Sequence, residues 1–204
     1  MKAKRRPPAV DALVNALKFF GMVLLTYLFH VCVIPDIRIL NVTPNLILAV
    51  LGVVCVCFEQ IKTAWYGLIM GILLEVMQPS TPLMSLLLYP ITASLCMLIF
   101  ADKSMRQLEY ERGLGKPGRN RSPWLRTPLC AAFASFIYEV VNITYVYLRG
   151  ADLEFAHILR GLSEILLTTG LAVLLMLPLR RFFGIRMAPD PNKLLRPAPY
   201  RKPE

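Results

Sequence analysis

The sequence predicts an all-α integral membrane protein, a compact bundle of about six transmembrane helices. The first observation behind this prediction is a series of long apolar runs, because a hydrocarbon core about 30 Å thick needs roughly 20 helical residues. The second is that Lys and Arg fall almost entirely into alternate gaps between these runs. The predicted spans are 12–34, 44–58, 63–77, 83–101, 128–148 and 158–179.

The basic residues also predict which side of the membrane each gap occupies. Cytoplasmic loops carry an excess of Lys and Arg near the ends of spans. With the N-terminus inside, all 23 basic residues lie on the cytoplasmic side except Lys18, Arg38, Arg149 and Arg160. We therefore expect a multi-pass inner-membrane protein with both termini in the cytoplasm. Its parts are a basic N-terminal segment (1–11), a six-helix membrane domain (12–181) that includes a basic cytoplasmic loop (102–126), and a Pro-rich cytoplasmic tail (182–204).

The second and third spans, 44–58 and 63–77, are short for a bilayer. Only residues 59–62 separate them, so they form either two tilted spans or a helical hairpin that dips into the membrane without crossing it. Both arrangements enter and leave on the same side, so the orientation of the other spans is the same in either case.

Three spans begin with a similar signal, a threonine followed by a proline. The threonines are Thr43, Thr81 and Thr127. A threonine hydroxyl caps a helix N-terminus, and proline suits the first helical position, where a backbone N–H has no intrahelical partner. Pro90, inside the fourth span, is expected to kink that helix.

Composition and motifs narrow the function classes. The net charge of +10 has an explanation in topology, since basic segments beside a membrane also attract anionic lipid. These residues are spread over separate inner segments rather than along one groove, so no nucleic-acid partner is expected. The five cysteines lie within spans and form no CxxC pair. The chain carries no HExxH or GxSxG motif, so we expect no catalytic residue, metal or cofactor, and no enzyme activity.

The third span carries small residues and one carboxylate at a four-residue step. These residues are Thr63, Gly67, Gly71 and Glu75. Such a face lets two helix backbones approach closely, which supports association where no hydrophobic effect drives helices together. Two interpretations stay open: packing within the chain, and a docking face for another membrane protein.

The fifth and sixth spans each carry a polar stripe on one side of the helix. Because an ionised carboxylate is costly in a bilayer, these side chains are expected to face the bundle and find partners, and Arg160 lies one turn from Glu164. If the stripes face each other, they form a polar seam beneath the outer rim, close to Glu75. The seam is interpreted as structural, as a small-molecule or ion pathway, or as an intramembrane enzyme site. The stripe residues are Ser135, Glu139 and Asn142 in the fifth span and His157, Arg160, Glu164 and Thr168 in the sixth.

Three short motifs resemble the rod shape-determining protein MreD family. They are a Pro-Asn opening to an apolar helix (44–52), a glycine-spaced helix that ends in Leu-Leu-Glu (67–75), and a Pro-Leu turn (82–84) before another apolar span. The resemblance covers residues 35–101, and it implies a compact six-helix membrane domain similar to the substrate-binding subunits of energy-coupling-factor transporters. The residues that carry the motifs are Pro44, Asn45, Gly67, Gly71 and Glu75.

The function that this resemblance implies is non-enzymatic. MreD-like proteins are membrane scaffolds of the bacterial cell-elongation (rod) machinery, which couples cell-wall synthesis to MreB and MreC and maintains cell shape. The implied partners are an MreC-like single-span protein and the elongation transglycosylase and transpeptidase, while the basic inner segments are expected to contact anionic lipid. The alternative is a membrane-embedded substrate-binding subunit of a vitamin-type small-molecule transporter, for which Ala12 and Ala16 in the first span would form a small-residue docking face.

Overall fold

The computed structural model describes residues 8–39, 42–58, 60–77, 83–101, 110–111, 113–114, 122–150 and 154–183. Within these residues the chain is helical apart from turns and an isolated antiparallel bridge between Ile39 and Val42. The predicted all-helical fold is confirmed. The elements are α1 (Pro8–Cys32), the short 3-10 helix η1 (Ile34–Asp36), α2 (Leu46–Cys57), α3 (Gln60–Met77), α4 (Met84–Phe100), α6 (Pro123–Leu148) and α7 (Phe155–Phe183).

Each predicted apolar segment contains a helix, but the helices differ in length. Three of them, α1, α6 and α7, are long and apolar enough to cross a membrane, with 25, 26 and 29 residues. The apolar helices α2 and α4 are shorter, with 12 and 17 residues.

The outward surfaces of the long helices are apolar. Leu17 of α1 and Leu174 of α7 are 73% and 71% exposed, and many further Leu, Ile, Val and Phe side chains of these helices point outward. Soluble monomers rarely expose large apolar patches, whereas lipid accommodates them. The surface of the protein therefore indicates membrane association.

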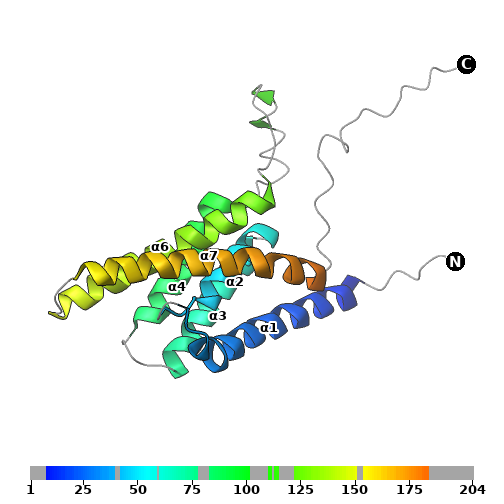
Figure 1. Cartoon of the computed structure of the whole chain (residues 1–204). Helices are drawn as coiled ribbons and strands as arrows, with labels where there is room; N and C mark the ends of the chain where they lie inside the picture. Colours follow the sequence, from blue (N-terminus) through cyan, green and yellow to red (C-terminus); the bar gives the residue numbers. More distant parts are fainter. Residues whose placement is uncertain are drawn as a thin grey trace, which may run out of the picture.

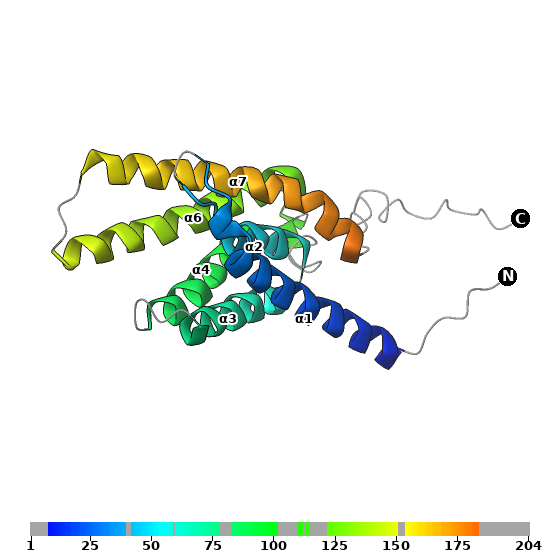
Figure 2. The same cartoon turned by 60° about the horizontal axis from the view of Figure 1, so that its bottom comes forward.

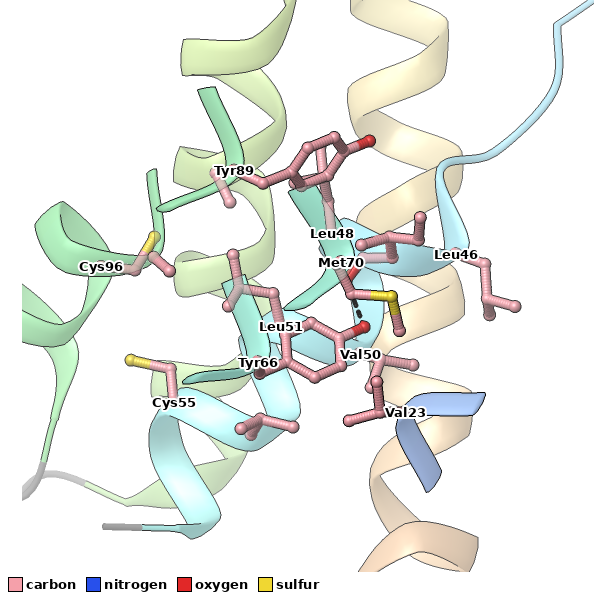
Figure 3. Packing of buried hydrophobic residues seen from close by; sticks show 14 of the residues in the cluster. Val23, Leu46, Leu48, Val50, Leu51, Cys55, Tyr66, Met70, Tyr89 and Cys96 are labelled. Atoms are coloured by element: carbon pink, nitrogen blue, oxygen red, sulfur yellow. Dashed lines mark hydrogen bonds between the residues drawn. The ribbon is translucent and has the colours of Figure 1, made fainter. Parts of the chain in front are cut away.

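Helix α2 lies at the centre of the bundle, with α6 and α7 on one side and α3 and α4 on the other (Figure 1, Figure 2). Every residue of α2 from Leu46 to Val56 is buried. The hydroxyl of Tyr66 in α3 donates to the Ile47 carbonyl at 3.1 Å, and Figure 3 shows the Tyr66 ring among apolar side chains that include Val50 and Met70. A helix that is apolar on all sides needs neighbours on all sides, and the surrounding helices supply them.

The pair α6 and α7 extends past the other helices. The two helices run side by side in both views and project beyond the bundle at the end where α6 leads into α7 (Figure 2). At the opposite end, the start of α1 and the end of α7 lie at the same side of the molecule.

The start of α2 differs from the predicted one. The sequence predicts Thr43 as the cap, but the helix begins after Asn45, whose side-chain oxygen accepts from the Leu48 N–H at 3.3 Å. Asparagine is at least as good a cap as threonine. The backbone N–H of Asn45 also donates to the Thr168 hydroxyl at 2.9 Å, so a contact with a distant helix favours the later start.

The start of α6 also differs. The prediction places Thr127 at the cap and Pro128 at the first helical position, whereas the helix begins at Pro123 and contains Pro128 in its interior. Pro123 suits a first helical position equally well. The additional turn contains Arg126, which is buried and donates from Nη1 to the Phe100 carbonyl at 3.1 Å. Arg126 therefore belongs to α6 and not to the predicted cytoplasmic loop.

Several sequence predictions fall on parts of the chain outside the described residues. The predicted cap Thr81 is one of them, and α4 follows Leu83, whose backbone is left-handed with a φ of 63°. Pro90 lies inside α4. The portions of the predicted N-terminal segment, basic loop and tail that lie outside are residues 1–7, 102–109, 112, 115–121 and 184–204.

Candidate functional site

The glycine face of α3 packs against α4. A Cβ atom added at Gly67 would lie 2.5 Å from the Ala93 Cβ and 2.9 Å from the Tyr89 carbonyl oxygen. One added at Gly71 would lie 2.9 Å from the Ser85 carbonyl oxygen. The absence of side chains at these two positions lets the backbones of α3 and α4 approach closely. Because α4 occupies this face around Gly67 and Gly71, the structure favours packing within the chain, the first of the two interpretations.

The two ends of the same stripe differ in environment. Thr63 is fully buried, whereas Glu75 is half-buried and accepts through Oε1 from the Leu83 N–H at 2.6 Å. Leu83 immediately precedes α4, so the carboxylate binds a backbone donor at a helix N-terminus, where negative charge is favourable. Glu75 therefore joins α3 to α4. The sequence predicts that Glu75 lies close to the polar seam of α6 and α7. Glu75 lines neither of the two cavities that lie beside that seam.

Asn45 connects three helices at the start of α2. Its backbone N–H donates to Thr168 in α7, and its Nδ2 donates to the Tyr89 hydroxyl in α4 at 3.4 Å. Its Oδ1 caps α2 at Leu48. Asn45 and the preceding Pro44 are both buried. The Pro-Asn opening thus lies where α2, α4 and α7 meet, and its polar groups are used in holding them together.

Two adjoining cavities lie beside the polar stripes of α6 and α7. The loop-side cavity has a volume of about 490 Å³ and extends from the stripes to the segment between α1 and α2. The interhelix cavity, of about 340 Å³, lies between α6 and α7. Asn142, Arg160 and Glu164 line both. The loop-side cavity is also lined by His30, Ile34, Pro35, Arg38, Thr43, Pro44, Asn45 and Tyr138, and the interhelix cavity by Glu139, Ile143, Val146, His157 and Gly161.

Glu139 is the most enclosed charged residue of the two cavities, with 7% of its surface exposed. Its carboxylate lies against the α7 backbone, because a Cβ atom added at Gly161 would be 3.0 Å from Oε2. Its carboxyl group is hydrogen-bonded to the Glu164 side chain and experiences the positive charge of Arg160. Its Oε1 has no hydrogen-bond partner among the described residues. Buried acceptors are normally satisfied, so Oε1 is an open hydrogen-bond acceptor, enclosed but without a partner among those residues.

Two of the predicted seam residues lie away from the cavities. Ser135 is buried in α6 and lines neither of them, and Thr168 is engaged by the Asn45 N–H. The structure brings the other members of the two stripes together around the cavities. These are Glu139, Asn142, His157, Arg160 and Glu164.

Sequence reasoning does not assign the ionisable cavity residues His30, Arg38 and Tyr138 to the site. His30 at the end of α1 and Arg38 after η1 reach the loop-side cavity from a distant part of the chain. Their only local signal is that they are polar residues at the end of an apolar span. Tyr138 lines the same cavity and packs on Tyr89, with 5.9 Å between ring centroids. It lies three residues after Ser135 and four before Asn142, so helical periodicity places it on the same face as the stripe and is a signal that could identify it.

The arrangement offers several kinds of polar group that can bind a ligand. Carboxyl, guanidinium, carboxamide and phenol groups meet at one place, and no group of three or more His, Cys, Asp and Glu within the described ranges is placed to hold a metal ion. No protein-family model, curated protein or solved structure matches this chain.

Proposed function

We propose that this protein is a non-enzymatic scaffold of the bacterial inner membrane that serves the cell-elongation (rod) machinery, couples cell-wall synthesis to the MreB and MreC system, and maintains cell shape. The observation that carries the proposal is the resemblance of residues 35–101 to the MreD family. The residues that carry this resemblance also hold the unit of α2, α3 and α4 together. Asn45 joins α2 to α4 and α7. Gly67 and Gly71 let α3 pack closely on α4, and Glu75 of α3 accepts a hydrogen bond from Leu83 at the start of α4.

We further propose that the six helices form a multi-pass membrane domain with both termini in the cytoplasm. Helices α3 and α4, with 18 and 17 residues, approach the roughly 20 that a bilayer needs. Helix α2 is shorter but enclosed by protein, so its ends need not reach the headgroups. The start of α1 and the end of α7 lie at the same side of the molecule, as this topology requires.

The proposed partners are an MreC-like single-span protein and the elongation transglycosylase and transpeptidase, with anionic lipid at the basic inner segments. Since α4 covers the glycine face of α3, a partner span would contact the outward apolar surface of the bundle instead. Packing between membrane spans depends on close van der Waals contact, which that surface provides.

One observation favours a second candidate function, the substrate-binding subunit of a small-molecule transporter. The loop-side cavity, at about 490 Å³, has the size of a ligand pocket. In that function the cavity residues would be essential, whereas a scaffold depends on the fold and on its outer surface. Arg160 lines both cavities and is exposed, so it is a suitable residue with which to separate the two candidates.

Depletion in a rod-shaped native host, followed by complementation, tests the proposal. We expect depleted cells to round up, and both the wild-type chain and the Arg160→Gln variant to restore rods, with the MreC-like protein co-purifying with each. Microscopy and membrane abundance of each variant are the measurements. Cells that stay rod-shaped on depletion would exclude the scaffold. Restoration by the wild type but not by an equally abundant Arg160→Gln variant would favour the transporter.

A further inference from the structure

We infer that the two adjoining cavities bind a small zwitterion, a molecule or lipid headgroup that carries an ammonium group and an anionic group a few atoms apart. This inference goes beyond the scaffold function and does not depend on it, because it concerns the cavities beside α6 and α7 rather than the outward apolar surface. It rests on the distribution of charge between the cavities and on the open acceptor of Glu139.

The charged side chains are unevenly distributed between the two cavities. Glu139 lines only the interhelix cavity and Arg38 only the loop-side cavity, while Arg160 and Glu164 line both. The interhelix end therefore holds two carboxyl groups beside one guanidinium, and the loop-side end adds a second guanidinium. Glu139 is withdrawn from bulk water and needs an opposite charge nearby, whereas Arg38 and Arg160 are exposed. An ammonium group complements the interhelix end, and an anionic group complements the end near Arg38.

The carboxyl group of Glu139 is an independent indication of a ligand with N–H donors. The side chain is more than nine-tenths buried, lines the interhelix cavity and has no partner for Oε1 within the described part of the chain. Leaving a buried acceptor unsatisfied is unfavourable. An ammonium group supplies both a donor and a compensating charge, whereas a quaternary ammonium group supplies only the charge.

The uncharged lining fits the same class of ligand. Asn142 lies where the cavities adjoin and offers both a donor and an acceptor between the two charged ends. Asn45 and Tyr138 add polar groups on the loop side. The phosphoethanolamine headgroup of a lipid and free phosphoethanolamine share this chemistry, and the two sources are separable by experiment.

The first experiment measures the melting temperature of the full chain in detergent with O-phosphoethanolamine, and with ethanolamine and inorganic phosphate as its two halves. The second measures lipid retention by native mass spectrometry, from nanodiscs that contain equal parts of phosphatidylethanolamine, phosphatidylcholine and phosphatidylglycerol. Stabilisation by O-phosphoethanolamine beyond that of either half supports a free zwitterion as ligand. Selective retention of phosphatidylethanolamine supports the headgroup. If neither result is obtained, the inference is overturned.

Variants test the orientation of the ligand. Glu139→Gln is expected to weaken binding of whichever zwitterion is found roughly tenfold or more, as loss of one partner of an enclosed charge pair does. Arg38 is exposed, and its Nε donates to the nearby Pro35 carbonyl, so Arg38→Gln is expected to leave the fold intact. This variant should weaken binding of the zwitterion while leaving any weak binding of ethanolamine unchanged. Ser163→Ala is the matched control, because Ser163 donates to the Leu159 carbonyl at 2.9 Å and lines neither cavity. Unaltered affinity in both Glu139→Gln and Arg38→Gln would overturn the inference.

Discussion

The α3–α4 pair and the α6–α7 pair are both antiparallel helix pairs of one bundle, yet they pack in different ways. Gly67 faces the Ala93 Cβ and a backbone carbonyl of α4, so these two backbones approach closely. Gly161 of α7 faces instead the end of the Glu139 side chain of α6, and a cavity of about 340 Å³ lies beside that contact. The same residue type thus serves backbone contact in one pair and carboxylate placement in the other.

This difference divides the molecule into a closely packed region and a polar region beside cavities. The unit of α2, α3 and α4 is held by apolar burial, small residues and the Asn45 hydrogen bonds, which leaves little room for change. The α6–α7 pair contains space, charged groups and an open acceptor. We expect substitutions in the first region to affect stability, and substitutions in the second to affect binding.

The largest effect on stability is expected from Gly67→Ala. The added methyl group would meet the Ala93 Cβ and the Tyr89 carbonyl oxygen, neither of which moves without the backbone, so we expect a loss of about 3 kcal/mol in the free energy of unfolding. Unfolding by SDS titration in detergent micelles measures it. Gly170→Ala in α7 is the control, since nothing lies within 4 Å of its added Cβ. Equal stability of the two variants would show that α3 and α4 are not in close contact.

A smaller loss is expected from Asn45→Ala. This change removes the side-chain cap of α2 and the hydrogen bond to Tyr89 but keeps the backbone bond to Thr168, so we expect about 1–2 kcal/mol in the same titration. Asn142→Ala is the matched control at the cavities, where the deleted amide leaves space that water can enter. A larger loss from Asn142→Ala than from Asn45→Ala would reverse the proposed division of the molecule.

The smallest effect is expected from Gly161→Ala. Alanine gains up to about 1 kcal/mol of helix propensity over glycine. This gain offsets the cost of displacing the flexible Glu139 carboxylate, so the free energy of unfolding should change by less than about 0.5 kcal/mol. Zwitterion affinity should fall, because Glu139 is displaced. A loss of stability like that of Gly67→Ala would indicate that α6 and α7 pack as closely as α3 and α4.

The sequence predicts the helices well because apolar length and basic flanks are local properties. It also places Gly67 and Gly71 on one face, but periodicity does not show whether that face meets α4 or another protein. The predicted helix starts are wrong where two capping signals compete. At α2, the start after Asn45 is favoured by a hydrogen bond with Thr168, which lies far along the chain. His30 and Arg38 line the loop-side cavity because of the path of the chain at the end of α1 and after it, which no local pattern encodes.

The central position of α2 has a consequence for how the protein is made. At 12 residues, this helix is about 18 Å long, too short to insert stably into a bilayer by itself. The helices that enclose it on one side, α6 and α7, leave the ribosome after it, and Thr168, which binds the Asn45 N–H, lies in the last of them. The enclosure of α2 is therefore completed only after α7 has been synthesised, and truncation before α7 would leave α2 without its full set of neighbours.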